Sequence, residues 1–259
     1  MKRILTLFFT FLFFMSVAQA KDMRFVQVSD ARFSDASDNT VFKKAVEDIN
    51  KQKDVEFVVF TGDNIAKPSA ELLESFLDEA KKLKCPFYIV LGDKEVNKLK
   101  HLSKAEYIQT IRKNVRKYKP EKPNYVFEKD GIIFAVVDGS KEVIPSTNGY
   151  YKEDVLVWLN RELAAHSKNH VIIFQHFPII PPAEKESYYT FKPEDYMTVL
   201  AVHKNVRAVI SGHFGVNSEK NVDNVMHITT AGLPYYRIID LMDYDTPNPT
   251  IWAQLKEIQ

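Results

Sequence analysis

The sequence predicts an α/β protein in which mixed β-sheets are flanked by helices. Between residues 23 and 91, short apolar segments rich in Val and Phe alternate with segments of helical period, and this order is typical of parallel βαβ units. The segments 125–127 and 132–137 flank Asp130-Gly131, a hairpin signal that predicts antiparallel pairing. Parallel and antiparallel strands together indicate mixed sheets.

The first half of the chain predicts three strand and helix units in succession. Strands are expected where apolar runs are bounded by polar residues, at 23–28, 55–60 and 87–91. The first helix begins at Asn39 or Thr40, either of which can cap it, and runs to about Lys51. Ser69 caps the next helix, which is expected over 70–83.

The second half of the chain predicts further helices and strands. Helices are expected where apolar residues recur at helical spacing, at 104–117, 152–166 and 193–202. Strands are expected at 171–174, 206–210, 226–230, 235–241 and 250–255. The last three of these strands are predicted to close a second sheet. The basic residues between 98 and 119 form either a phosphate-binding patch or a solvated helix face.

The first twenty residues have the composition of a secretory signal peptide. Lys2 and Arg3 precede an apolar stretch, and Ala18-Gln19-Ala20 offers the small residues of a cleavage site. The apolar stretch is short for a membrane span, and a retained amino-terminal anchor is the alternative. We expect an exported protein, periplasmic or secreted, whose mature part is one domain over residues 21–259 without a membrane span.

Charge and cysteine content narrow the classes of partner and cofactor. Removal of Lys2 and Arg3 takes the formal net charge from +1 to −1, which gives no electrostatic basis for nucleic-acid binding. Cys85 is the single cysteine, and this excludes an internal disulfide and a cysteine-based zinc site. The oligomeric state is left open by the sequence.

Oxygen and imidazole donors follow the ends of several predicted strands. They are Asp30, Asp63, Asp93, His176 and His213. Ligands of open α/β sheets bind outside the carboxyl ends of the strands, so these side chains are expected to meet at one edge. Carboxylates and imidazoles are the donors of divalent transition metals. The sequence therefore predicts a metal site with Asp63 at its centre.

The order of these donors resembles the calcineurin-like metallophosphoesterases, which include purple acid phosphatases and nucleotide phosphodiesterases. The family pattern runs Asp-x-His, Gly-Asp, Gly-Asn-His-Glu or Asp, a lone His, and Gly-His-x-His. This chain has Asp30-Ala31-Arg32, Gly62-Asp63, Gly92-Asp93-Lys94-Glu95, His176 and Gly212-His213-Phe214-Gly215 in the same order. The resemblance covers essentially the whole mature chain. It implies a sandwich of two mixed β-sheets flanked by helices, divalent metal and phosphoester substrates.

The departures from the family pattern fall mainly on one of its two metals. For that metal the resemblance implies Asp30 and Asp63 as ligands, but Arg32 and Gly215 stand where imidazoles belong. A guanidinium keeps its proton, and about 4 Å from a dication it adds a repulsion of about 8 kcal/mol at an effective dielectric near 20. If Arg32 points inward, we expect this metal to be lost. Asp30 is then either a fifth ligand of the other metal or the ion-pair partner of Arg32.

The other metal of the family keeps a complete set of donors. The resemblance implies that Asp63, Asp93, His176 and His213 hold one Zn²⁺, Mn²⁺ or Fe²⁺, with Asp93 in place of an asparagine. The alternative is a metal-free pocket in which hydrogen bonds satisfy these loop residues. Lys94 replaces the histidine that resembles a general acid in the family, and lysine is a poor proton shuttle near neutral pH.

Three residues beside the donors have two interpretations each. Arg32 and Lys94 are expected to be catalytic, clamping a phosphate and replacing the charge of the missing metal. Alternatively, they only neutralise a cluster of carboxylates. Asn64 is expected to contact substrate, although an amide that caps its own loop has the same sequence signature.

The leading functional hypothesis is an exported, metal-dependent phosphoesterase that uses one metal and turns over slowly. Its substrate is a phosphorylated small molecule or another phosphoester, and the sequence does not distinguish monoesters from diesters. The competing hypothesis is an inactive protein of the same fold that binds a phosphorylated ligand or a protein partner. A cell-envelope interaction protein without a ligand is a third hypothesis.

Overall fold

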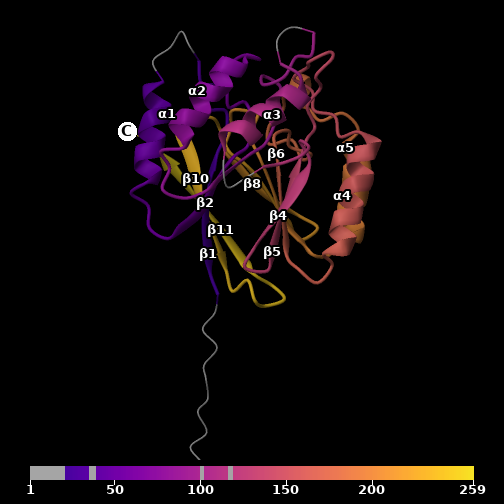
Figure 1. Cartoon of the computed structure of the whole chain (residues 1–259). Helices are drawn as coiled ribbons and strands as arrows, with labels where there is room; N and C mark the ends of the chain where they lie inside the picture. The colour runs from indigo at the N-terminus through magenta and orange to yellow at the C-terminus, as the bar shows by residue number, and fades with distance from the viewer. Residues whose placement is uncertain (1–20, 35–38, 100–101, 116–118) are drawn as a thin grey trace, which may run out of the picture.

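The computed structural model describes residues 21–34, 39–99, 102–115 and 119–259, so the predicted signal peptide lies outside the described residues. In the described part of the chain, the strands form one five-stranded and one six-stranded sheet. Helices cover the outer faces of both sheets (Figure 1). The predicted sandwich of two mixed sheets is therefore confirmed. No helix of these described ranges combines the length and the apolar character that crossing a membrane requires.

The five-stranded sheet has the strand order β11-β10-β1-β2-β3. Its strands are β1 (Met23–Val28), β2 (Val55–Phe60), β3 (Phe87–Ile89), β10 (Tyr235–Met242) and β11 (Thr250–Glu257). The strands β1, β2 and β3 run parallel, whereas β10 pairs antiparallel with both β1 and β11. Helices α1 (Thr40–Ile49) and α2 (Ala70–Ala80) connect the parallel strands, as the βαβ pattern predicts.

The six-stranded sheet has the strand order β4-β5-β6-β7-β9-β8. Its strands are β4 (Tyr125–Lys129), β5 (Ile132–Val137), β6 (Val171–Gln175), β7 (Val206–Ser211), β8 (Ser218–Val222) and β9 (Val225–Thr229). The four inner strands run parallel, and β4 and β8 pair antiparallel at the two edges. The remaining helices are α3 (Lys104–Asn114), α4 (Glu153–Ala165), α5 (Pro193–Val202) and the short 3₁₀ turn η1 (Glu186–Tyr188).

An aromatic layer joins the inner faces of the two sheets. Phe25 and Phe57 stack with ring centroids 5.0 Å apart, and Phe134 and Phe174 of the other sheet meet Phe25 edge-on. The outer face of the five-stranded sheet packs against α1, α2 and α3, and that of the six-stranded sheet against α4 and α5 (Figure 1). Because both faces are covered, the central strands read as continuous apolar runs.

The structure corrects the sequence predictions in four places. The three late strands do not close one sheet, because β9 joins β7 whereas β10 and β11 extend the other sheet beside β1. The sequence analysis missed β8, whose residues are mostly polar and exposed. Asn39 precedes α1 without capping it, and its side chain accepts a hydrogen bond from the Ser34 amide instead. α2 ends at Ala80, but Ser69 caps it as predicted.

Candidate metal centre

The predicted donors follow the carboxyl ends of β1, β2, β3, β6 and β7, and they meet at one edge of the sandwich. Backbone geometry at these strand ends is unusual. Asp30, Arg32, Asp63 and His213 have φ angles of 48°, 47°, 52° and 75°. Non-glycine residues rarely adopt this left-handed region, and such strain concentrates at functional sites. The chain turns sharply after β1, β2 and β7, which brings the side chains that follow these strands toward a common centre.

Gly62 allows β2 and β6 to place their donors close together. Its φ is +91°, and a Cβ atom at this position would lie 2.5 Å from Nδ1 of His176. Any larger residue would displace the imidazole, so the glycine before Asp63 is required by the approach of His176 as well as by the turn.

Two backbone carbonyls fix the orientation of the two imidazoles. Nδ1 of His176 lies 2.8 Å from the Thr61 carbonyl oxygen, and Nε2 of His213 lies 2.7 Å from the Thr147 carbonyl oxygen. A carbonyl only accepts, so each of these nitrogens carries a proton and donates it. The opposite nitrogens, Nε2 of His176 and Nδ1 of His213, face each other at 3.1 Å. Metal-binding histidines are commonly oriented by this type of contact.

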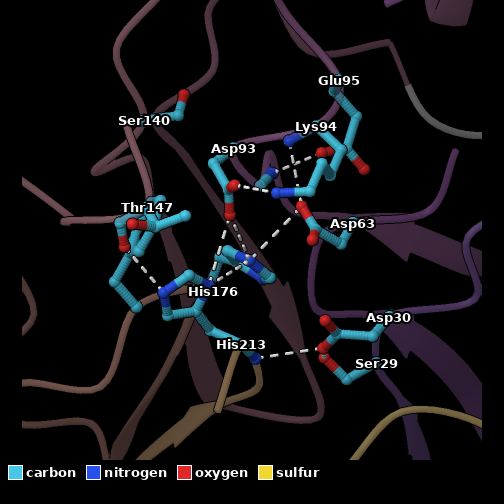
Figure 2. A network of polar contacts seen from close by, with 12 residues as sticks. Ser29, Asp30, Asp63, Asp93, Lys94, Glu95, Ser140, Thr147, His176 and His213 are labelled. Carbon is cyan, nitrogen blue, oxygen red and sulfur yellow. Dashed lines mark hydrogen bonds and ion pairs between the residues drawn. The ribbon is translucent and has the colours of Figure 1, made fainter. Parts of the chain in front are cut away.

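Asp93 completes a compact group of donors with the two imidazoles (Figure 2). Its Oδ1 lies 3.4 Å from Nε2 of His176 and 3.2 Å from Nδ1 of His213. Oδ1 of Asp63 lies 3.4 Å from the same His176 nitrogen. Tetrahedral Zn²⁺ bonds of about 2.0–2.2 Å place neighbouring ligand atoms about 3.3–3.6 Å apart, so these spacings fit one small divalent cation.

An unpaired oxygen supports this fit. Oδ1 of Asp93 is buried and accepts no hydrogen bond from any residue that the structure describes. Buried polar atoms without a partner are rare in folded proteins and call for an explanation such as a missing ion. Because the same oxygen faces both inward imidazole nitrogens, the residues present fit a divalent metal ion.

Arg32 occupies the space beside a second group of donors. Asp30, Asp63 and His176 also lie close enough to share an ion. However, Nη2 of Arg32 lies 3.2 Å from Oδ1 of Asp30 and 3.8 Å from Oδ2 of Asp63. The guanidinium therefore points inward, between the two carboxylates. Asp30 is further held by Ser29 Oγ and by the His213 amide, at 2.7 and 3.0 Å.

Gly215, which stands at the other missing imidazole, offers no donor. Its φ is +68°, and the space next to its Cα is open. The family's first metal therefore lacks both imidazoles in this chain, while a cation from the protein lies between its two remaining carboxylates.

The titration of the site follows from its crowded charges. Burial opposes ionisation of Asp93, but the two imidazoles and the Lys94 ammonium, which is in direct ion-pair contact with it, hold its pKa below the usual range. Burial also opposes protonation of His176, yet Asp63 and Asp93 outweigh it and raise the pKa of His176 to about 10. Burial lowers the pKa of His213. In metal-free protein, Nε2 of His176 therefore carries a proton that lies among the metal-binding atoms of Asp63, Asp93 and His213.

Asn64 takes neither of the two roles that the sequence left open, because its side chain joins the loop after β2 to the end of β3. It is completely buried, and its side-chain Nδ2 donates to the Val90 carbonyl at 3.1 Å. This placement faces the protein interior and gives no support to a substrate contact. Lys94, by contrast, is partly exposed beside Asp93, and its amide donates to Oδ1 of Asp63 at 3.0 Å.

Glu95 is a residue of the site whose role the sequence analysis missed. It is fully buried, and its two carboxylate oxygens accept from the amides of Asn64 and Gly92. These amides neighbour Asp63 and Asp93 in the chain, so Glu95 ties the two carboxylate-bearing loops together. Its place in the third motif was visible in the sequence, but nothing in the sequence indicated which amides it would bind.

η1 covers the centre on the side of His213. The Tyr188 ring packs on the His213 imidazole with centroids 4.7 Å apart, and the Lys185 ammonium lies 3.4 Å from the centre of the Tyr188 ring. Thr147, whose carbonyl orients His213, also donates from its hydroxyl to the Ser187 carbonyl at 2.7 Å. The turn is therefore attached to the same loop that orients the imidazole.

Carboxylates and imidazoles gather at the strand ends of a two-sheet sandwich. This arrangement is typical of α/β proteins that bind divalent metals at that edge. Comparison with known families specifies this class further. Residues 23–217 match the model of the calcineurin-like phosphoesterases. The match covers most of the chain, and the protein belongs to this family, as the resemblance predicted. Membership supports a hydrolase of phosphoesters that uses divalent metal.

Individual relatives are distant. A probable cyclic nucleotide phosphodiesterase of Xenorhabdus bovienii (strain SS-2004) is 23% identical over 175 residues, and the match covers 64% of each chain. A dimetal phosphatase from Danio rerio superposes with a TM-score of 0.68 at 16% identity, over 92% of this chain and 99% of that one. GAP50, described as the anchor in the inner membrane complex of Plasmodium, has a TM-score of 0.62 at 15% identity, over 93% and 90%. These structural likenesses show the fold.

Proposed function

We propose that this protein is a phosphoester hydrolase that works with one divalent metal and with Arg32 in place of a second. The observation that supports this most directly is the contrast between the two donor groups. One group is complete, with carboxylate oxygens 3.2–3.4 Å from the inward imidazole nitrogens, whereas the other has a guanidinium between its carboxylates.

Four residues would hold the metal in this proposal: Asp63, Asp93, His176 and His213. When bound, the ion supplies Lewis-acid activation of water and neutralises part of the charge of the phosphoryl group. Zn²⁺, Mn²⁺ and Fe²⁺ all suit two carboxylates and two imidazoles. The carbonyls of Thr61 and Thr147 hold the outward protons of the two imidazoles, so that the inward nitrogens face the metal position. In metal-free protein the inward nitrogen of His176 carries a proton, which the metal would displace.

Arg32 and Lys94 bind and orient the phosphoryl group in this proposal. Their side chains are 53% and 38% exposed, so both remain accessible from solvent while they contact the carboxylates of the centre. A guanidinium and an ammonium donate to phosphate oxygens and stabilise the charge that develops there. Neither group shuttles protons readily near neutral pH, so the proposal includes slow turnover.

An inactive binding protein of the same fold is the second candidate. Ion pairs favour it, because Arg32 and Lys94 already contact the carboxylates Asp30, Asp63 and Asp93 without any metal. Such a protein would use the exposed parts of both cations to hold a phosphorylated ligand or a protein partner without turnover.

Metal content and hydrolysis separate the two candidates. Protein purified without chelator should contain about one divalent metal per chain, and His213→Ala should lose it. His166→Ala, which removes a histidine at the end of α4, serves as the matched control and should retain the metal. Aryl phosphate monoesters and diesters with added Mn²⁺ then test turnover. Metal-free, inactive wild-type protein would support the binding protein and overturn the hydrolase.

We also propose that residues 1–20 direct export and are then removed. The basic start, the apolar stretch and the Ala18-Gln19-Ala20 segment support this. Mass spectrometry of the protein recovered outside the cytoplasm of an expressing bacterium should give a chain that begins at Lys21. Recovery of the intact chain from the cytoplasm alone would contradict the proposal.

A further inference from the structure

A polar cavity lies at the opposite end of the six-stranded sheet from the metal centre. It measures about 450 Å³ and lies between the end of α5, the first residues of β7 and β9, and the β8–β9 hairpin. The metal ligand His213 follows the carboxyl end of β7, whereas this cavity is lined by Val206 and Arg207 at its amino end. Volumes of this size are typical of small-molecule sites.

Arg207 is a partly buried cation without an anionic partner. Its Nε donates to Nδ1 of His170 at 2.9 Å, and its Nη2 donates to the Pro247 carbonyl at 2.7 Å. Among the described residues, no carboxylate forms an ion pair with it, and no carboxylate contributes to the shift of its pKa. Burial lowers the pKa of Arg207. A guanidinium stays charged nonetheless, so an anion in the cavity would relieve this unbalanced charge.

His227 adds an unpartnered polar group to the same cavity. The residue is 7% exposed, and its Nε2 is buried without a hydrogen-bond partner in the described part of the chain. Burial lowers the pKa of His227 to about 4, despite the nearby Asp223 carboxylate. The imidazole is therefore neutral at physiological pH and offers one donor and one acceptor.

The walls of the cavity define what kind of anion fits. Lys204 adds a second cation and Asp223 a carboxylate, so the lining carries one net positive charge together with Arg207. Met197, Leu200 and Ile251 supply an apolar surface beside these charges. One net positive charge suits a singly charged head group, and the apolar wall suits a short hydrocarbon attached to it.

We propose that this cavity binds a small organic carboxylate, with the carboxylate on Arg207 and the hydrocarbon against α5. The guanidinium donates to the carboxylate oxygens, and His227 forms part of the same cavity wall. This site is separate from the proposed phosphoesterase centre and does not depend on its activity.

Titration of the full-length protein with hexanoate tests the proposal. Calorimetry should detect saturable binding, and the NMR signals of the His227 imidazole should shift with the same dissociation constant. Hexanol, which has the hydrocarbon without the charge, should not bind. Loss of the charge-assisted contact in Arg207→Gln should weaken binding at least about tenfold. Arg161→Gln, an exposed arginine on α4, is the matched control and should bind as the wild type does.

Three results would overturn the proposal: an unshifted His227 signal at saturating hexanoate, equal binding of hexanol, or unchanged affinity in Arg207→Gln. Because Arg207 also contacts His170 and Pro247, Arg207→Gln requires a fold check by circular dichroism. If it fails to fold, Lys204→Gln carries the same test, since Lys204 is exposed. That variant should weaken hexanoate binding severalfold, and unchanged affinity would count against the site.

Discussion

Replacing Arg32 by histidine tests whether its guanidinium excludes a second divalent cation. The substitution removes the fixed charge between Asp30 and Asp63 and restores one imidazole of the family pattern. Gly215→His restores the other. The position has open space, but its φ of +68° is left-handed, and a side chain there costs about 1–2 kcal/mol. We therefore expect Arg32→His by itself to allow a second divalent ion to bind. Adding Gly215→His should strengthen the binding of that ion only partly.

The geometry of the ion pairs gives the magnitude. Nη2 of Arg32 lies 3.2 and 3.8 Å from the oxygens of Asp30 and Asp63, so a dication held by the same oxygens would be in close proximity to it. At about 4 Å the repulsion is about 8 kcal/mol for an effective dielectric of 20. The side chain is 53% exposed, and both rotation and solvent reduce this value. A quarter of it, about 2 kcal/mol, still corresponds to about a thirtyfold change in affinity.

Metal titration is the assay. Wild-type protein freed of metal and titrated with Mn²⁺ should bind about one ion per chain, and Arg32→His should bind a second at least about thirtyfold more tightly than the wild type does. Arg32→Lys keeps the charge and serves as the control, with one ion expected. Two tight ions in the wild type, or identical stoichiometry in all three proteins, would refute the reasoning.

Four further predictions concern the site and the core. Apparent Mn²⁺ affinity should rise about tenfold between pH 7 and pH 8, because the metal must displace the proton from His176, whose pKa is raised to about 10 although burial opposes this. Titration calorimetry in buffers of different ionisation enthalpy should show that about one proton is released for each ion bound. An affinity that does not change with pH would contradict the protonation of His176. The raised pKa of His176 also makes the stability of metal-free protein depend on pH. Its contribution to the free energy of unfolding is complete below about pH 6.5 and is lost as the pH rises toward about 10. Glu95→Ala should lower the free energy of unfolding of metal-free protein by about 2–6 kcal/mol, measured by urea denaturation, because two buried amides lose their acceptor. Glu95→Gln keeps one acceptor oxygen and should lower the free energy of unfolding by less. Equal decreases in the two variants would show that the amides are not the cause. Phe57→Ala should lower the free energy of unfolding by about 3–5 kcal/mol, measured by thermal denaturation. Its ring stacks on Phe25 of the same sheet and meets Phe134 of the other sheet, each at 5.0 Å. Trp252→Ala, at an exposed site on β11, is the control that should change little.

The sequence predicted the strand ends well because each one combines an apolar run with a short polar loop. Asp63 and Asp93 could be assigned to the same sheet edge from the sequence alone, since parallel strands of one sheet bring their carboxyl ends together. The same argument applies to His176 and His213, whereas the meeting of the edges of the two sheets required the structure. The pairing of β10 with β1 could not be predicted in this way. A strand pattern shows that a face is buried, but the partner strand is far away in the chain and leaves no local signal.

Side-chain orientation was the other limit of the sequence. The inward position of Arg32 depends on left-handed backbone at Asp30 and Arg32. This conformation is rare for non-glycine residues and cannot be recognised from the amino-acid sequence. The orientation of the two histidines depends on backbone carbonyls of Thr61 and Thr147, and every residue has a carbonyl. These features required the structure, although the residue types that use them were visible beforehand.

The departures from the family pattern balance one another in charge. Asp93 in place of asparagine adds a negative charge, and Lys94 in place of the neighbouring histidine adds a positive one that is in direct contact with it. Arg32 similarly balances part of the charge of Asp30 and Asp63. Without a metal, the carboxylates of Asp30, Asp63 and Asp93 therefore face Arg32, Lys94 and the protonated His176.

This balance supports the proposal that the site binds one dication rather than two. A single ion that displaces the His176 proton changes the net charge of this group of residues by one positive unit, because the proton leaves as two positive charges enter. A second ion would add two more units beside Arg32, in a region where Asp30 and Asp63 are the only carboxylates that the structure places within reach of it. At the short distances involved, that excess is several kcal/mol even with strong screening. In the proposed function, the Arg32 guanidinium and one bound metal therefore supply the positive charge of the two metals that the family pattern implies.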